Sequence, residues 1–138
     1  METFGIIAAM QEEMKEIENI MIEKEYKNIY ELCFIQGKIN NTAVVLVEAG
    51  VGKVNAARTT QILIDKFHIN GVINVGSAGS GNDELQIGDI VIGKKLVQHD
   101  FDITAFGYQK GYISNVGQFI ESDKSLIEKM EHTISKIK

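Results

Sequence analysis

A short apolar run that leads into a segment of glycine, serine and alanine is the feature that most constrains the fold of this chain. The apolar run covers residues 71–75, and residues 76–81 read Gly-Ser-Ala-Gly-Ser-Gly. Glycine lets a ligand approach the main chain closely, because no Cβ stands in the way. Such a loop after a buried strand is typical of the ligand crevice at the carboxyl edge of an α/β sheet, although a structural turn explains an isolated cluster equally well. Two further strand ends, at residues 8–10 and 49–52, share this small-residue character and favour the crevice.

Length and composition predict one soluble globular domain, residues 1–138. Hydrophobic residues make up 44% of the chain and charged residues 24%, which is ordinary for such a domain. The net charge of −5 argues against a nucleic-acid partner or an anionic membrane surface. No apolar run reaches membrane-spanning length and the amino terminus lacks a basic start, so we expect a cytoplasmic protein. The single cysteine, Cys33, lies in an apolar run and is expected to be a buried structural thiol.

Apolar runs that alternate with helical periodicity predict an α/β chain. Strands are expected at residues 4–9, 29–36, 42–47, 68–75 and 90–93, with a hairpin turn at 37–41 and a further turn at 85–89. Helices are expected at residues 11–25 and 54–67, and after an N-cap at Ser122. Their buried stripes are predicted to be Val54, Ala57, Leu63, Ile64 and Phe67 in the second helix, and Leu126, Met130, Ile134 and Ile137 in the last.

Several familiar motifs are absent or weak. The Gly-Lys pair at residues 52–53 is not a P-loop, because valine stands where that motif needs glycine and serine or threonine, and no dinucleotide-binding glycine pattern follows a strand. His99, Asp100 and Asp102 have no ligand spacing typical of metal sites, so we expect no metal and no other cofactor. The aromatic loop at residues 99–108 is better interpreted as an interface.

Two adjacent carboxylates, Glu12 and Glu13, open the first predicted helix. Acidic residues favour the positive end of a helix, and that alone explains most such pairs. Neighbours in a helix point about 100° apart, so one carboxylate can face solvent while the other faces the crevice. The spacing does not decide which of the two faces the crevice.

Five segments taken together, at residues 5–14, 50–57, 74–79, 88–91 and 99–108, resemble the 5′-methylthioadenosine/S-adenosylhomocysteine nucleosidases of the purine nucleoside phosphorylase superfamily. The resemblance implies a three-layer α/β/α fold with a central mixed sheet. It also implies a homodimer that acts on a small 5′-thioadenosine. The implied reaction is hydrolysis of the N-glycosidic bond of 5′-methylthioadenosine or S-adenosylhomocysteine, with 5′-deoxyadenosine as a further substrate, to release adenine and the corresponding thioribose.

The resemblance also implies roles for individual residues. Glu13 would position and deprotonate the attacking water, which suits glycosidic cleavage through an oxocarbenium-like sugar. The other implied contacts are Met10 under the ribose, Val51 near the 5′-thio group, Ser77 at the water, the backbone of Ala78 and Gly79 beside the base, and Ile103 and Phe106 in the neighbouring subunit's pocket.

Some features of the family have no counterpart among these 138 residues. They are an aspartate that protonates adenine N7, a Met-Glu pair at the ribose hydroxyls and an arginine near the water. We therefore expect the sequence to be the amino-terminal portion of a longer enzyme. It would carry the water side of the reaction, lack the leaving-group side, and be inactive alone.

Two alternatives stay open. A phosphate-dependent nucleoside phosphorylase of the same superfamily would need arginine forks for the phosphate dianion. The only arginine is Arg58, within a predicted helix, and Asn74-Val75 stands where resembling phosphorylases place an arginine, which favours hydrolysis. The second alternative is a non-catalytic fragment that binds nucleosides or dimerises.

Overall fold

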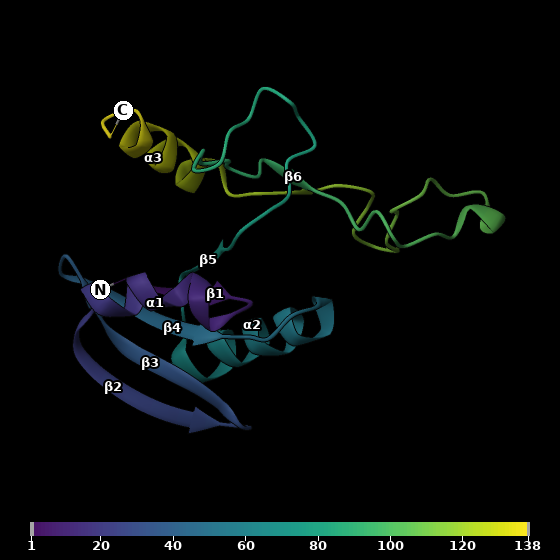
Figure 1. Ribbon diagram of the computed structural model, residues 1–138. Coiled ribbons are helices and arrows are strands. Elements are labelled where there is room, and N and C mark those ends of the chain that lie inside the picture. The colour runs from purple at the N-terminus through teal and green to yellow at the C-terminus, as the bar shows by residue number, and fades with distance from the viewer. Residues whose placement is uncertain (1, 138) are drawn as a thin grey trace. The chain divides into compact units, whose positions relative to one another are not determined.

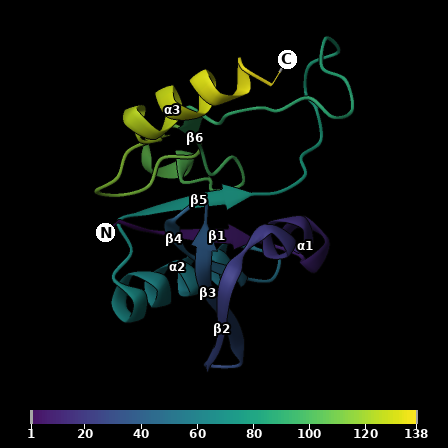
Figure 2. The same ribbon diagram turned by 90° about the vertical axis from the view of Figure 1, so that its left-hand side faces the viewer.

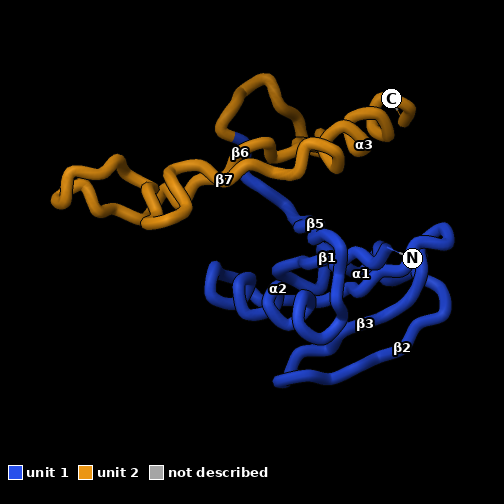
Figure 3. Tube along the Cα trace, turned by 180° about the vertical axis from the view of Figure 1, so that it is seen from behind, with its two compact units in different colours: residues 1–80 blue, residues 81–138 orange. Residues whose placement is uncertain are grey.

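The structure is a computed structural model that describes residues 2–137 (Figure 1). The chain forms two compact units, residues 1–80 and 81–138, which Figure 3 colours separately. Within residues 2–137, no helix has the length and apolar character needed to cross a membrane.

The first unit is built on a mixed sheet with the strand order β2-β3-β4-β1-β5. β1 is parallel to β4 and β5, while β3 is antiparallel to β2 and β4. The mixed α/β fold expected from the resemblance is therefore confirmed. The elements of this unit are β1 (Thr3–Ala8), α1 (Gln11–Ile20), β2 (Ile22–Ile29), β3 (Leu32–Ile39), β4 (Thr42–Glu48), α2 (Lys53–Phe67) and β5 (Gly71–Val75).

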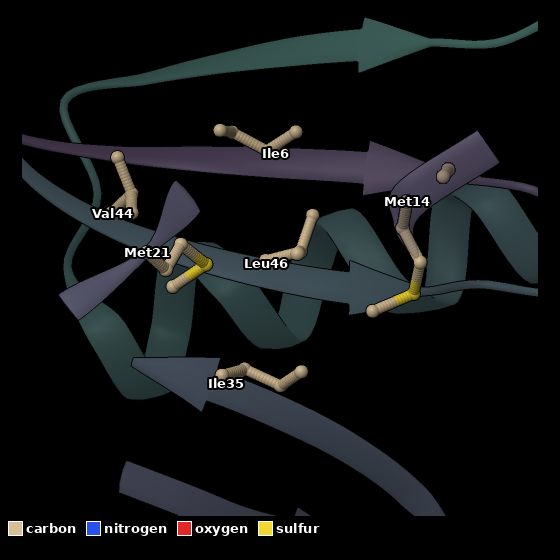
Figure 4. Close-up of a cluster of buried hydrophobic side chains, with 7 residues drawn as sticks. Ile6, Met14, Met21, Ile35, Val44 and Leu46 are labelled. Atoms are coloured by element: carbon tan, nitrogen blue, oxygen red, sulfur yellow. The ribbon is translucent and has the colours of Figure 1, made fainter. Parts of the chain in front are cut away.

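The two helices cover opposite faces of this sheet, which gives three layers (Figure 2). Alternate strand residues point to opposite faces, so neighbours such as Ile6 and Ile7 belong to different cores. On the α1 side, Met14 and Met21 pack with strand residues that include Leu46 (Figure 4). The core on the α2 side consists of Ile7, Phe34, Val45, Val47, Ala49, Ile62 and Leu63.

Among the described residues, one polar side chain is fully buried, that of Thr59 on α2. Within the described residues, the Thr59 hydroxyl oxygen finds no hydrogen-bond partner. An unpaired buried hydroxyl costs free energy, whereas a methyl group of the same shape does not.

We therefore expect Thr59→Val to raise the free energy of unfolding by about 1 kcal/mol. The same change at the half-buried neighbour, Thr60→Val, controls for helix propensity and should change it by less than about 0.5 kcal/mol. Urea unfolding followed by circular dichroism measures both values. A Thr59→Val protein no more stable than the wild type would show that the hydroxyl is paired in solution.

The predicted helix at residues 11–25 is wrong beyond Ile20. Met21 has an extended backbone, and β2 begins at Ile22. β2 was missed because its residues are almost all exposed and carry no alternating apolar pattern. Pairing with β3 defines the strand instead. A bulge lies between Ile22 and Glu25, where a Cβ on Gly37 would come within 2.8 Å of the Ile22 carbonyl oxygen.

The predicted hairpin turn at residues 37–41 is narrower in the structure. β3 continues to Ile39, and the turn consists of Asn40 and Asn41, both with positive φ. A second two-residue turn, Tyr30-Glu31, joins β2 to β3 with the same backbone conformation. Asparagine tolerates this conformation well, but tyrosine and glutamate do not signal it in a sequence.

Two predictions about burial in the first unit are wrong. On α2, Val54, Ala57 and Ile64 are exposed, whereas Leu63 is buried as expected. The actual buried face contains Thr59 and Ile62 as well. Cys33 is exposed rather than buried. It lies near the start of β3 opposite Asn28 of the exposed edge strand β2, and it lines an open hollow.

The second unit contains β6 (Lys95–Leu96), a 3₁₀ turn η1 (Thr104–Phe106), β7 (Ile120–Glu121) and α3 (Lys124–Ile134). The predicted turn at residues 85–89 is present, closed by a hydrogen bond from the Asp89 amide to the Gln86 carbonyl. The predicted buried strand at residues 90–93 is wrong, because this apolar run has no ladder partner among the described residues and is mostly exposed.

The last helix also differs in detail from its prediction. Its N-cap is Asp123, whose carboxylate accepts a hydrogen bond from the Leu126 amide at 2.9 Å, rather than Ser122. Leu126 and Ile134 are half-buried, while Met130 and Ile137 are exposed. The predicted apolar face exists, but no residue of α3 is buried.

Candidate functional site

The three small-residue segments found in the sequence follow strands that end at one edge of the sheet. β1, β4 and β5 are parallel, and Ala8 pairs with Glu48 on one side and Val75 on the other. The Ala49 amide also donates a hydrogen bond to the Ala8 carbonyl at 2.8 Å. The fold therefore brings the β1–α1 turn, the β4–α2 loop and the loop after β5 to the carboxyl edge, where α/β sheets bind ligands.

Glu13 is the side chain that connects two of these segments. Its Oε1 atom accepts hydrogen bonds from the Ser77 amide at 2.9 Å and the Ser77 hydroxyl at 3.1 Å. Its Oε2 atom accepts from the Ala9 amide at 3.1 Å and the Met10 amide at 3.2 Å. Glu13 and Ser77, which lie 64 positions apart in the chain, are thus in direct contact, and both carboxylate oxygens are held from two sides.

These hydrogen bonds decide the charge state of Glu13. The Ser77 amide makes the largest contribution to lowering the pKa of the Glu13 carboxyl, partial desolvation opposes it, and the Ser77 hydroxyl and the Met10 and Ala9 amides lower the pKa further. The net shift is downward, so the side chain is a carboxylate at neutral pH. The neighbour Glu12 is exposed, whereas all four of these donors bind Glu13.

The lowered pKa of Glu13 predicts a specific dependence of stability on pH. A carboxyl whose folded pKa lies below its unfolded value, about 4.3, stabilises the fold above that value, and this contribution is lost as the pH falls through the folded pKa. We expect the difference in unfolding free energy between the wild type and Glu13→Gln to shrink as the pH is lowered from 7 to 3. Urea unfolding at a series of pH values measures it. A difference that stays constant would contradict the charge state assigned here.

Two apolar residues that the resemblance assigns to the substrate lie on segments at this edge of the sheet. Met10, the N-cap of α1, is 40% exposed, and Val51, in the β4–α2 loop, is 70% exposed. Asn55 secures this loop by donating a hydrogen bond from its side-chain amide to the Val51 carbonyl at 2.8 Å. Nothing in the sequence assigned a role to Asn55, because an asparagine shortly after a glycine-rich turn is too common a pattern to reveal one.

The remaining predicted site residues lie on exposed loops. Ala78 and Gly79 follow Ser77 and are exposed in the first unit. In the second unit, Ile103 is half-buried and Phe106 is 79% exposed in η1. Asp102 starts this turn by accepting a hydrogen bond from the Thr104 amide at 2.9 Å, and that bond lowers the pKa of the Asp102 carboxyl.

Residues 2–137 contain no group of three or more histidine, cysteine, aspartate or glutamate side chains placed to hold a metal ion. Arg58, a possible anion-binding residue, lines an open hollow of about 590 Å³ on the first unit. Glu18, Glu31 and Glu48 line the same hollow. Glu13 and Ser77 do not line this hollow.

Comparison with known proteins gives this geometry a context. The model of the phosphorylase superfamily matches residues 3–138. The chain belongs to the phosphorylase superfamily. This confirms the family placement that the five sequence segments suggested.

Within the superfamily, the chain is similar to nucleosidases. It is 39% identical over 132 residues to the 5′-methylthioadenosine/S-adenosylhomocysteine nucleosidase of Staphylococcus haemolyticus, covering 96% of this chain and 58% of that protein. A solved nucleosidase from Streptococcus pneumoniae, in complex with the transition-state inhibitor MT-ImmA, superimposes with a TM-score of 0.93 at 37% identity, covering 99% of this chain and 59% of the other. Futalosine hydrolase of Helicobacter pylori superimposes with a TM-score of 0.92 at 30% identity, covering 98% and 58%. The chain thus spans somewhat more than half the length of the relatives it matches.

Proposed function

We propose that the full-length protein hydrolyses the N-glycosidic bond of 5′-methylthioadenosine and S-adenosylhomocysteine, releasing adenine and the corresponding thioribose. The observation that carries the proposal is the ionised Glu13 carboxylate held between the β1–α1 turn and Ser77 at the carboxyl edge of the sheet. It is supported by the similarity of the whole chain to proteins named for this activity.

In this proposal Glu13 acts on the sugar side of the bond. Glycosidic cleavage develops positive charge on the sugar, and a fixed carboxylate stabilises that charge without reorganising. Once positive charge has developed on the sugar, a water molecule that attacks the sugar becomes more acidic, so a weak base is enough to remove its proton. A carboxylate whose pKa is lowered by four hydrogen bonds suits this role. The Ser77 hydroxyl, which donates a hydrogen bond to Glu13 Oε1, would help to hold the water beside it.

The substrate contacts are proposals on the same basis. Met10 would pack under the ribose, and Val51 would contact the 5′-thio group, since apolar side chains suit a thioether. The backbone of Ala78 and Gly79 would line the base. Accepting 5′-deoxyadenosine requires no additional polar contact, because its 5′ position carries only hydrogen.

Dimerisation and cellular role complete the proposal. Phe106 is a large apolar side chain that the second unit leaves 79% exposed, and exposed aromatic residues are typical of protein interfaces. We propose that Ile103 and Phe106 enter the pocket of a partner subunit in a homodimer. The protein would be cytoplasmic and would serve nucleoside catabolism and methionine salvage, without a metal or other cofactor.

Phosphorolysis is less well supported. Phosphate carries two negative charges and needs arginine or equivalent donors. Arg58 is the only arginine in the chain, and the carboxylates of Glu18, Glu31 and Glu48 line the hollow beside it. These negative charges would repel a phosphate dianion.

The test is to incubate the full-length protein with 5′-methylthioadenosine, with and without phosphate, and to measure adenine release by chromatography. We expect release at the same rate in both reactions. A rate that depends on phosphate would establish the phosphorylase alternative.

Futalosine belongs in the same assay, because the similarity to a futalosine hydrolase makes that reaction a second candidate. If no compound is cleaved, calorimetry with adenine distinguishes a non-catalytic nucleoside-binding protein.

A further inference from the structure

Gly76 is the first residue of the small-residue segment that follows β5. It lies between Val75, which pairs with Ala8 at the end of the sheet, and Ser77, whose amide and hydroxyl bind Glu13. Its φ lies outside the left-handed region that favours glycine. A requirement for glycine at this position therefore comes from the atoms that a side chain would meet.

The space beside Gly76 is filled by the Glu13 carboxyl group. A Cβ on Gly76 would lie 3.1 Å from Glu13 Oε1 and 3.4 Å from both Cδ and Oε2. Apart from the atoms of Gly76 and its two chain neighbours, these three carboxyl atoms are the described heavy atoms nearest to that position. The carboxylate therefore occupies the space that a side chain at residue 76 would enter, and a methyl group there would lie closer to Oε1 than an ordinary van der Waals contact allows.

Neither side of this contact can move freely. Glu13 is held by donors on both oxygens, so a shift of a few tenths of an ångström away from residue 76 must lengthen bonds to Ser77, to Ala9 or to Met10. The backbone at residue 76 is tied on one side by the β1–β5 pairing and on the other by the bond from the Ser77 amide. A side chain at residue 76 would therefore displace the Glu13 carboxylate and lengthen its hydrogen bonds.

We propose that Gly76 is a positioning residue for Glu13: its missing side chain lets the carboxylate reach the Ser77 amide and hydroxyl. This inference rests on the proposed function for its catalytic consequence, but its structural part does not. It predicts that Gly76→Ala moves the carboxylate, weakens the bonds to Ser77, and brings the pKa of Glu13 back towards its ordinary value.

The structural part is tested by a double-mutant cycle in the full-length protein, with unfolding measured for the wild type, Gly76→Ala, Glu13→Ala and the double variant. If the methyl group acts through the carboxylate, Gly76→Ala lowers stability in the wild type and has little effect when Glu13 is already alanine. A double variant that folds when Gly76→Ala alone does not would give the same support. An equal loss in both backgrounds, or failure of both proteins to fold, would overturn the inference.

Two further measurements separate positioning from a general structural effect. Carbon-13 NMR titration of the Glu13 carboxyl should show a higher pKa in Gly76→Ala. The kcat for hydrolysis should fall by about tenfold or more, with a smaller change in KM.

Gly81→Ala is the matched control, because a Cβ there meets no described heavy atom within 4 Å and its φ is also ordinary. A Gly76→Ala protein with the pKa and kcat of the wild type would overturn the inference. If the wild type has no hydrolase activity, the proposed function fails, while the cycle and the titration still decide the role of Gly76.

Discussion

Glu13→Gln is expected to lower kcat for hydrolysis of 5′-methylthioadenosine by about 10²–10⁴-fold in the full-length protein. The amide has no charge to stabilise an oxocarbenium-like sugar and cannot accept a proton from water. It also presents an NH₂ group where Glu13 presents an oxygen. That group would face either the Ser77 amide or the amides of Ala9 and Met10, which are all donors. Steady-state kinetics with adenine release as the readout measures the loss.

The neighbouring acid provides the control for this prediction. Glu12→Gln removes the same charge one position away on the same helix, where the side chain is exposed, and should leave kcat within about twofold, since surface substitutions have small effects. Equal losses in the two variants would mean that general charge at the start of α1, rather than the carboxylate held by Ser77, supports the reaction. Full activity of Glu13→Gln would remove Glu13 from the proposed mechanism.

Phe34→Ala is expected to lower the free energy of unfolding by about 3–5 kcal/mol. Phe34 is fully buried on the α2 side of the sheet, and its ring centroid lies 4.9 Å from that of Phe67. Truncation would remove this aromatic contact and leave a cavity beneath α2 that the rigid sheet cannot close. Chemical denaturation monitored by circular dichroism measures the change.

A matched control for this prediction lies on α2 itself. Val54→Ala truncates an apolar side chain that is 83% exposed, so it should change the free energy of unfolding by less than about 0.5 kcal/mol. A loss below about 1 kcal/mol for Phe34→Ala would show that the core beneath α2 collapses around the vacated space.

The sequence by itself determined the elements that bury apolar residues on a regular period. β1, β4 and β5 were predicted from continuous apolar runs, because a strand covered on both faces buries successive residues. The helix α2 was predicted from its period, although most of its predicted buried stripe is exposed. The five motif segments likewise identified the superfamily, and they singled out Glu13 and Ser77 before any contact between them was visible.

Only the tertiary structure decided what depends on pairing or on contact across the chain. β2 is defined by its partner β3 and not by its own exposed residues, so its sequence read as a continuation of α1. Spacing could not choose between Glu12 and Glu13; the choice follows from four donors, two of them on a residue 64 positions away. Cys33 looked buried from its apolar neighbours, yet it is exposed opposite an exposed edge strand. A local sequence pattern reflects the helix or strand to which a residue belongs. The exposure of Cys33, the charge state of Glu13 and the space beside Gly76 depend instead on residues that come close only when the chain folds.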